Sequence, residues 1–230
     1  MKRNIKSLRR KVLSKALRSC IPPLKEDYYW ESTYYNWLER IKSGEEDELK
    51  WLKKLPEEKL DDENGDFLYP DVVMEARGLS STMYAAFLVS LWSDVEHFLK
   101  NSCKVCKNLS KCNKKNLDKK CWKFRELKKC LKKGIDFDSE KHSDYNMINA
   151  VRILNNEFKH NTGYYSGKEK KDYDKMNKDL CIKWNIKEDE RVDYAKLPHK
   201  ELIFACGRFC DDIAKKLISA IKSKEVLDAE

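Results

Sequence analysis

Residues 80–101 read SSTMYAAFLVSLWSDVEHFLKN, and this stretch decides the fold class. Its large apolar side chains recur three or four positions apart, which is the spacing of one face of an α-helix. A serine at its start, Ser80 or Ser81, can cap that helix by accepting a hydrogen bond from a backbone N–H group of the first turn. We therefore predict a long helix with one buried face, made of Tyr84, Phe87, Leu88, Leu91, Val95, Phe98 and Leu99.

Helical spacing continues on both sides of this stretch. It predicts helices over residues 4–19, 24–42, 144–160 and 199–221, with a shorter one over 45–54. Seven Gly and five Pro among 230 residues supply too few turns for a β-sandwich or a β-barrel. One segment alternates instead, with apolar residues at 180, 182, 184 and 186, a polar turn, and then Val192 and Tyr194. The sequence thus predicts an all-α fold, a helical bundle with a small β-hairpin insert.

Three features of the sequence bear on where the protein works. No apolar run approaches the roughly 18–20 residues that a membrane helix needs. The basic amino terminus lacks the apolar core of a secretion signal. The nine cysteines are an odd number, which fits reduced thiols or metal ligands better than a full set of disulfides. We expect a soluble, cytoplasmic protein that does not enter a membrane.

Charge is unevenly distributed along the chain. Residues 100–133 hold fourteen Lys and Arg against two acids, an excess of twelve that is larger than the net charge of +9 for the whole chain. Residues 41–75, in contrast, hold twelve Asp and Glu. A basic segment can bind phosphates, and Trp122 and Phe124 between its lysines can stack on bases. We predict nucleic-acid contacts there, with an ordinary solvated helix surface as the alternative, through Lys114, Lys115, Lys119, Lys120 and Lys123.

The basic segment also carries a run of four cysteines, Cys103-x₂-Cys106-x₅-Cys112-x₈-Cys121. Structural zinc sites take four ligands, often all thiolates, so this run predicts a zinc site, with Cys130 as a further candidate ligand. Two alternatives stay open, namely reduced thiols in a lysine-rich helical hairpin and a disulfide. Cys206 and Cys210 lie four residues apart on an apolar helix face, where we expect core packing.

The predicted helix 144–160 has two different faces. Met147, Val151, Leu154 and Phe158 share the apolar one. A polar stripe lies nearly opposite, made of Asn149, Arg152, Asn156 and His160, with Asn155 and Lys159 beside it. A stripe of this kind is most often a solvated helix surface. The alternative is a binding site, because the stripe combines cations that bind phosphate, amide donors, and an imidazole, a group that titrates near neutrality.

The run AVRILNNEFKHNTG at residues 150–163 resembles the signature helix of HEPN domains, which are α-helical bundles of RNA-cutting toxins and antiviral systems. The family's motif is an Arg, often followed by Asn, with four to six residues before a His at the helix end. Here Arg152 lies eight positions before His160, and Asn155 occupies the position five before it. The family's preceding helix carries an acidic or polar residue that faces the motif, and Asp94 and Glu96 are the candidates in this chain.

The resemblance implies a HEPN-like bundle over residues 80–230, with a Cys/Lys-rich insert at 100–133, preceded by a helical extension with an acidic stretch over 1–79. It also implies a homodimer that acts on RNA, as a metal-independent endoribonuclease of a toxin–antitoxin or antiphage system with an antitoxin or defence partner protein. The family's catalysis needs no cofactor, so a zinc ion would be structural. Because the arginine is displaced, a non-catalytic RNA- or protein-binding dimerisation module of the same fold is the alternative.

Overall fold

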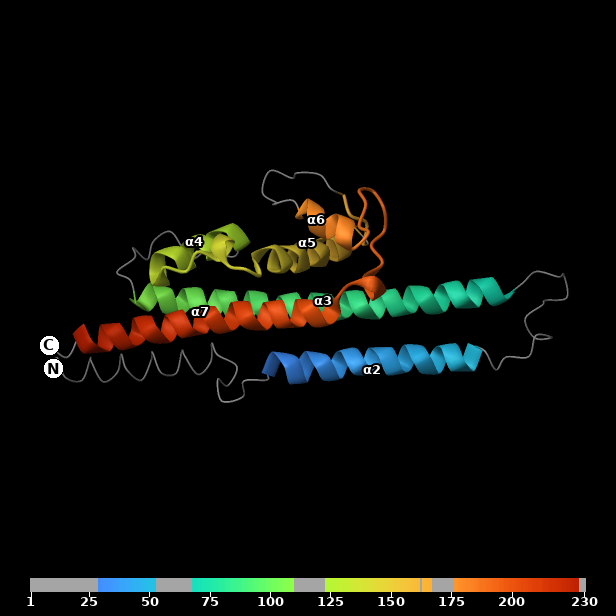
Figure 1. Cartoon of the computed structure of the whole chain (residues 1–230), viewed down its shortest axis with the longest axis horizontal. Coiled ribbons are helices and arrows are strands. Elements are labelled where there is room, and N and C mark those ends of the chain that lie inside the picture. Colours follow the sequence, from blue (N-terminus) through green and yellow to red (C-terminus); the bar gives the residue numbers. More distant parts are fainter. Residues whose placement is uncertain (1–28, 53–67, 110–122, 162, 167–175, 228–230) are drawn as a thin grey trace. The chain divides into compact units, whose positions relative to one another are not determined.

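The computed structural model describes residues 29–52, 68–109, 123–161, 163–166 and 176–227. These residues are mostly α-helical (Figure 1), in α2 (Tyr29–Leu52), α3 (Leu68–Leu109), α4 (Phe124–Ile135), α5 (Tyr145–Asn161), α6 (Lys178–Lys183) and α7 (His199–Leu227). Two short 3₁₀ helices, η3 (Ser139–Lys141) and η4 (Tyr194–Lys196), lie between them. The predicted all-α class is confirmed. The predicted helix over 4–19 lies outside the described residues.

The chain divides into two compact units. The first contains Ser93–Ile148 and Phe204–Glu230, and the second contains Ser32–Trp92 and Asn149–Ile203. Four of the described helices, α2, α3, α5 and α7, contain residues of both units, because residues 29–31 of α2 also belong to the first. The boundary that the sequence suggested between residues 79 and 80 falls inside α3, which continues through it as one helix.

In the second unit, α2 and the first part of α3 run antiparallel (Figure 1). The hydroxyl of Tyr34 donates to the carbonyl of Ser90 at 3.1 Å. Eleven residues later in α2, Glu45 accepts hydrogen bonds from Ser80 at 2.9 Å and from Tyr84 at 3.2 Å, both earlier in α3. Later residues of α2 thus contact earlier residues of α3, as expected for two antiparallel helices. Burial of the ring and the neighbouring carboxylate of Glu45 raise the pKa of Tyr84 to about 12.

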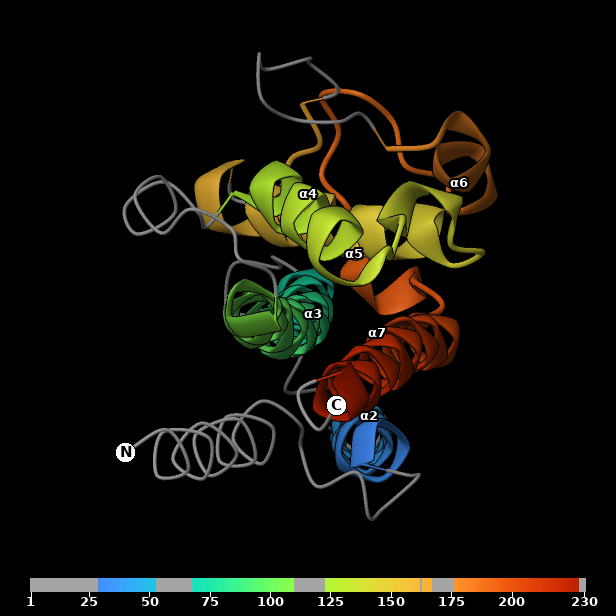
Figure 2. The same cartoon turned by 90° about the vertical axis from the view of Figure 1, so that its left-hand side faces the viewer.

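In the first unit, the later part of α3 and α7 lie side by side, and α4 packs against α3 (Figure 2). The segment after α4 is attached to α7 by a ring contact and an ion pair. The rings of Phe137 and Phe209 meet edge to face with their centroids 5.5 Å apart. His142 Nε2 lies 3.3 Å from a carboxylate oxygen of Asp212. Cys206 and Cys210 are 0% and 2% exposed in the core of this unit, so the expected core packing of these two cysteines is confirmed.

Three sequence expectations about helices are corrected. The helix predicted to begin at residue 80 begins at Leu68, and the two predicted over 24–42 and 45–54 are one helix, α2. That helix passes through Gly44, where an added Cβ would meet nothing within 4 Å. A glycine costs a helix only about 1 kcal/mol relative to alanine, so it does not have to end one.

The predicted β-hairpin is not confirmed. Its first strand is instead the helix α6, which Asn177 caps by accepting hydrogen bonds at its side-chain oxygen from the backbone N–H groups of residues 179 and 180. The second half of the predicted hairpin pairs elsewhere, through one isolated antiparallel bridge between Tyr164 and Arg191. The alternation at 180–186 was therefore not a strand signal.

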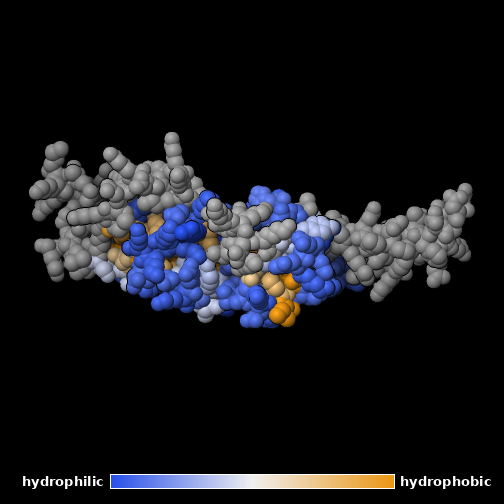
Figure 3. Space-filling view, turned by 90° about the horizontal axis from the view of Figure 1, so that it is seen from above, coloured by the Kyte–Doolittle hydropathy of each residue, from blue (hydrophilic) through white to orange (hydrophobic). Residues whose placement is uncertain are grey.

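The surface of the described residues is largely polar. On the face drawn in Figure 3, hydrophilic residues predominate and apolar residues are scattered. Five large apolar residues are exposed among those described: Trp37, Met83, Tyr164, Ile182 and Phe204. None of the described helices has the length and apolar character needed to cross a membrane.

Candidate functional site

Helix α5 carries the polar stripe, and the first part of that stripe is buried. Every residue from 148 to 155 is buried, including Asn149, Arg152 and Asn155, which are 6%, 6% and 2% exposed. A solvated helix face is therefore excluded for this part of α5. Asn156 is half-buried, and Lys159 and His160 are exposed. Only the end of the stripe is accessible to a large ligand.

Arg152 is fixed by a neighbour one turn earlier. Its Nε and Nη2 atoms donate to Oδ1 of Asn149 at 3.1 and 2.8 Å. This bond holds the guanidinium toward the start of α5, and His160 lies toward the other end. With a rise of about 1.5 Å per residue, the eight positions between Arg152 and His160 span about 12 Å along the axis. The structure does not bring these two predicted catalytic residues together.

Asn155 occupies the position at which the HEPN motif has its arginine. Its Nδ2 donates to Oδ1 of Asn156 at 3.1 Å. Its own Oδ1 is buried and has no hydrogen-bond partner. A buried acceptor without a partner typically costs about 1–3 kcal/mol. The fold therefore tolerates an unfavourable free-energy term at this amide. The amide is also closed to solvent.

Tyr194 holds the exposed end of α5 in place. Its hydroxyl donates to the carbonyl of Leu154 at 3.0 Å, in a buried hydrogen bond. Its ring packs edge to face on Phe158, with centroids 5.6 Å apart. Burial raises the pKa of Tyr194, so the hydroxyl keeps its proton and remains a donor. Lys159 and His160 thus project from a helix end whose inner side is packed.

Helix α5 ends at Asn161, one residue after the predicted end, with a glycine soon after. Gly163 has φ 86, a backbone region that glycine enters without steric cost. Its N–H donates to the carbonyl of Glu157 at 3.1 Å, which satisfies one of the carbonyls left open at a helix end. The carbonyl of Gly163 then accepts from the N–H of Val192 at 2.9 Å. These bonds fix the chain that leaves the site.

Asp94 and Glu96, the predicted acidic partners of the motif, lie on the part of α3 that belongs to the first unit. Asp94 is exposed. Glu96 is half-buried and forms an ion pair with Lys100 at 2.9 Å, one helical turn away. Exposed or half-exposed pairs of this kind contribute about 0.5 kcal/mol or less to stability, so the pair orients Glu96 more than it stabilises the helix.

Most of the predicted nucleic-acid contacts lie outside the described residues, namely Lys114, Lys115, Lys119 and Lys120. Lys123 is described, and it is exposed at the N-cap position of α4. Arg125 and Lys133 of the same helix are also exposed. Three further lysines of α4 are engaged with acids: Lys128 with Glu140 at 2.8 Å, Lys129 with Glu126 at 3.0 Å and Lys132 with Asp138 at 2.8 Å. The excess of basic residues therefore continues along α4, where neighbouring acids neutralise part of the positive charge.

Half of the predicted zinc site is described. Cys103 and Cys106 lie on α3 and are 5% and 1% exposed, whereas Cys112 and Cys121 lie outside the described residues. Over the parts of the chain that the structure describes, no group of three or more His, Cys, Asp or Glu is arranged to hold a metal ion. A zinc site in this segment therefore depends on the two cysteines that are not described, and it remains a prediction.

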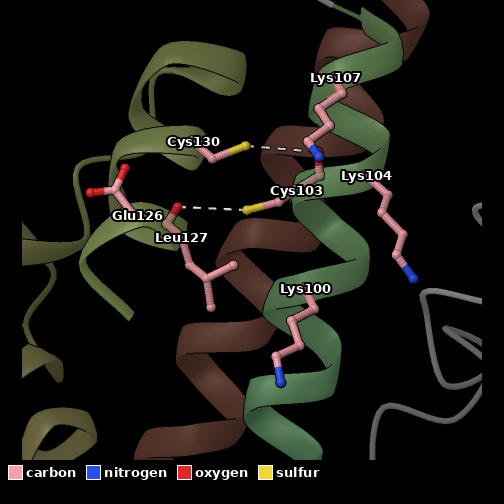
Figure 4. A pocket seen from close by; sticks show the side chains of 7 residues that line it. All are labelled: Lys100, Cys103, Lys104, Lys107, Glu126, Leu127 and Cys130. Carbon is pink, nitrogen blue, oxygen red and sulfur yellow. Dashed lines mark hydrogen bonds between the residues drawn. The ribbon is translucent and has the colours of Figure 1, made fainter. Parts of the chain in front are cut away.

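The structure instead brings Cys130 of α4 against Cys103 of α3 (Figure 4). Cys103 Sγ donates to the carbonyl of Leu127 at 3.6 Å, and Cys130 Sγ lies 3.7 Å from the carbonyl oxygen of Cys103. Cys103 and Cys130 border a hollow between α3 and α4, whose other sides are formed by Lys100, Lys104, Lys107, Glu126 and Leu127. The separation of these two cysteines in the sequence hid this contact, and only helical spacing on both segments could have suggested it.

A buried histidine also escaped the sequence analysis. His199, the first residue of α7, is 6% exposed and stacks on Tyr84 with ring centroids 4.6 Å apart. Phe87 meets the same imidazole edge to face at 5.7 Å. Burial among these rings lowers the pKa of His199 to about 4, because an imidazolium there would lose its hydration. His199 is a neutral core residue at pH 7.

The comparisons with protein-family models, with curated proteins and with solved structures found no match for this chain. What can be said of its function therefore rests on the residues themselves.

Proposed function

We propose that this chain is an RNA-directed protein of the HEPN kind, and that it acts as a metal-independent endoribonuclease of a toxin–antitoxin or antiphage system. One observation carries the proposal. The end of α5 presents Lys159 and His160 side by side in solvent, while Tyr194 holds its inner side. A cation and an accessible imidazole close to one phosphodiester can supply charge stabilisation and general acid–base help.

The chemistry uses the RNA's own 2′-hydroxyl. His160 takes the proton of that hydroxyl, the oxygen attacks the adjacent phosphorus, and the bond to the 5′-oxygen of the next nucleotide breaks. The products are a 2′,3′-cyclic phosphate and a free 5′-hydroxyl. Lys159 stabilises the negative charge that grows on the phosphate, and Asn156 supplies an amide that can orient the ribose or the imidazole.

A second imidazole completes the proton balance, because the departing 5′-oxygen must receive a proton. In the HEPN family two motif helices meet across a homodimer, and the resemblance supplies this second group as His160 of another copy. Burial of residues 148–155 inside one chain restricts such a meeting to the exposed end of α5. The proposal therefore implies that two copies face each other at Lys159 and His160.

Arg152 has a structural part in this proposal. Its guanidinium is bonded to Asn149, on the side away from His160. Replacing Arg152 takes two donors from the buried Oδ1 of Asn149, and a buried acceptor that loses its donor typically costs about 1–3 kcal/mol. Replacing Arg152 is therefore expected to impair folding, and a loss of activity in such a variant says nothing about catalysis.

The test is the cleavage rate of a defined single-stranded RNA by the purified full chain and by His160→Ala. General acid–base help typically contributes about 10²–10⁴-fold, so the variant should be slower by at least about 100-fold. Since His160 is exposed, the variant should fold normally. His97, exposed on α3, provides the matched control, and His97→Ala should cleave at the parent's rate. Equal rates for the parent and His160→Ala would remove the catalytic assignment.

A non-catalytic RNA- or protein-binding dimerisation module is the second candidate, and a specific observation favours it. The position five before His160 holds Asn155, which is buried and carries no charge. No guanidinium is thus offered at the family's spacing. This candidate predicts RNA binding that weakens with salt, without cleavage by the parent chain. Exposed cations of α4, including Lys123, Arg125 and Lys133, would supply phosphate contacts.

A further inference from the structure

Tyr164 and Arg191 form an antiparallel bridge just beyond the end of α5. Two backbone hydrogen bonds flank this bridge, from the N–H of Val192 to the carbonyl of Gly163 at 2.9 Å and from the N–H of Tyr165 to the carbonyl of Glu190 at 3.0 Å. Residues in this register face each other without a backbone hydrogen bond between them. Their Cα atoms lie about 4.5 Å apart in such a pair, and their side chains stand next to each other on one face.

The burial of the neighbouring residues shows that this face is open to solvent. Tyr165 and Val192 belong to the opposite face, because side chains alternate along an extended chain, and they are 6% and 4% exposed. Tyr164 is 50% exposed, and Arg191 is exposed as well. A phenol ring and a guanidinium are therefore presented together to solvent, on a backbone whose other side is packed.

This pair lies close to the exposed end of α5. The N–H of Tyr164 donates to the carbonyl of Asn161 at 3.0 Å, so the chain turns directly after the helix. Four Cα–Cα steps separate Tyr164 from His160, which limits their Cα atoms to a distance of about 15 Å even in an extended chain. The stem of Arg191 lies beside Gly163, since its Cγ would be 4.0 Å from a Cβ added there. The ring, the guanidinium and the imidazole thus share one region of the second unit.

Two acids close to Arg191 in the sequence are already paired with lysines. Glu190 lies 3.3 Å from Lys187, and Asp193 lies 2.9 Å from Lys196. Among the described residues, neither of these acids pairs with Arg191 itself. A guanidinium can bind a phosphate through two parallel hydrogen bonds. Arg191 therefore offers a phosphate contact next to an exposed ring.

We propose that Tyr164 and Arg191 form a subsite for one unpaired nucleotide of the RNA, next to the phosphate on which Lys159 and His160 act. The base stacks on the ring of Tyr164, and the guanidinium of Arg191 binds the phosphate of the same nucleotide. This subsite rests on the proposed function, because it holds a nucleotide beside the reacting phosphate of that site. It narrows the substrate to single-stranded RNA.

The restriction to single strands follows from stacking. A base inside a duplex is covered on both faces by its neighbours, whereas an unpaired base can lie on an aromatic side chain. Every base has a π-face, so stacking by itself does not read the sequence. The subsite should therefore favour unpaired over paired RNA and tolerate any of the four bases.

A single exposed aromatic side chain is common on protein surfaces and needs no ligand. Tyr164 differs from such a residue in two ways. The bridge places a guanidinium beside its ring. The end of α5 adds a second cation and an imidazole, Lys159 and His160, which are both exposed. Rings interleaved with cations are what single-stranded nucleic acid binds.

The test measures binding without cleavage, so that its result is separate from that of the proposed function. A short fluorescein-labelled RNA carries a methyl group on every 2′-oxygen, which leaves no 2′-hydroxyl to attack. Its affinity for the full chain is measured by fluorescence anisotropy, once as a single strand and once in a perfect duplex. The basic segments of the chain can bind both forms, so the effect of each substitution on the two forms is compared.

Tyr164→Ala should weaken binding of the single strand by about 5- to 150-fold, the range expected for one lost stacked base, and leave duplex binding unchanged. Tyr164→Trp keeps a ring and should bind like the parent. Tyr164→Leu keeps an apolar side chain without a ring and should bind as weakly as Tyr164→Ala. Ile182→Ala, at a position that is 79% exposed in the same unit, is the control and should change neither affinity. A Leu variant that binds like the parent would overturn the stacked base.

Arg191→Gln tests the phosphate contact through its salt dependence. The slope of log K against log salt concentration for the single strand should become shallower by about 0.7, the value of one phosphate contact. Arg40→Gln, at an exposed arginine of α2, removes the same charge elsewhere in the unit and should leave the slope unchanged. An unchanged slope in Arg191→Gln would overturn the role of Arg191.

The outcomes separate the subsite from the catalytic assignment. A chain that binds the single strand through Tyr164 and Arg191 but cleaves no RNA would remove the proposed function and support the subsite. A chain that cleaves RNA, with an affinity that none of the Tyr164 and Arg191 variants changes, would support the proposed function and overturn the subsite.

Discussion

Acid should destabilise this protein through one buried side chain, His199. The imidazole is stacked on Tyr84 and enclosed by Phe87, so protonation there places a charge in an apolar pocket. In the unfolded chain the same group is hydrated and binds a proton with its usual affinity. As the pH falls, the unfolded state therefore takes up a proton that the folded state refuses, and the folded state loses stability.

The size of the effect follows from the two pKa values. Folding lowers the pKa of His199 from 6.5 to about 4, and at about 1.36 kcal/mol per unit this difference is worth about 3 kcal/mol. The contribution is fully present above pH 6.5, declines between pH 6.5 and pH 4, and is absent below pH 4. Against a typical total of about 5–15 kcal/mol, the loss is large enough to measure.

Urea unfolding between pH 7 and pH 4.5 measures this effect when the parent is compared with His199→Gln, which cannot titrate. Carboxylates that titrate in this range act on both chains and cancel in the difference. The free energy of unfolding of the parent should fall by about 2–3 kcal/mol more than that of the variant. His97→Gln, at an exposed position, is the control and should follow the parent. Parent and His199→Gln curves that run parallel would refute the account of this pocket.

Three further predictions concern packing, the motif helix and the cysteine run. Gly134→Ala should lower the free energy of unfolding by about 1–3 kcal/mol, measured in urea, because the new methyl group would overlap Cys106. Tyr194→Phe should cost about 1 kcal/mol in the same assay, since it leaves the buried carbonyl of Leu154 without its donor. If the four-cysteine run holds zinc, elemental analysis of protein purified under reducing conditions should find about one zinc per chain, and metal-free protein would end that prediction.

The existence of the helices could be predicted because the apolar periodicity is strong. The residues at which they begin and end could not. The buried face from Tyr84 to Leu99 was found residue by residue. Its start was placed at Ser80 because Ser80 or Ser81 can cap a helix, yet α3 continues from Leu68. Gly44 lies in the gap between the two helices predicted over 24–42 and 45–54, and α2 continues through it. Local propensities of about 1 kcal/mol mark a boundary only where packing does not override them.

The segment 180–186 was misread for a different reason. Alternation of apolar residues over only seven positions is also compatible with one short helix followed by a turn. Asn177 was the better signal, because its side chain caps α6 by accepting hydrogen bonds from two backbone N–H groups. A capping residue just before a short ambiguous run should have outweighed the alternation.

The candidate site was half predictable. Periodicity placed Arg152 and His160 on one stripe, but it could not say that Asn149 and Asn155 are buried with Arg152. Burial depends on which other segments cover the helix, and this information is not local. The contact of Cys130 with Cys103 was out of reach for the same reason. This contact forms because α3 packs against α4. The spacing of the cysteines along the sequence suggested a zinc site instead.

The central claim is that the end of α5 cleaves RNA through the 2′-hydroxyl, and the chemistry of the fragment ends tests it most directly. The purified chain is incubated with a defined RNA in EDTA, and both ends of each fragment are identified by mass spectrometry. The account predicts 2′,3′-cyclic or 3′-phosphate ends together with 5′-hydroxyl ends, at a rate that His160→Ala lowers by at least about 100-fold. Fragments with 3′-hydroxyl and 5′-phosphate ends, cleavage that EDTA abolishes, or an RNA that remains intact would contradict it.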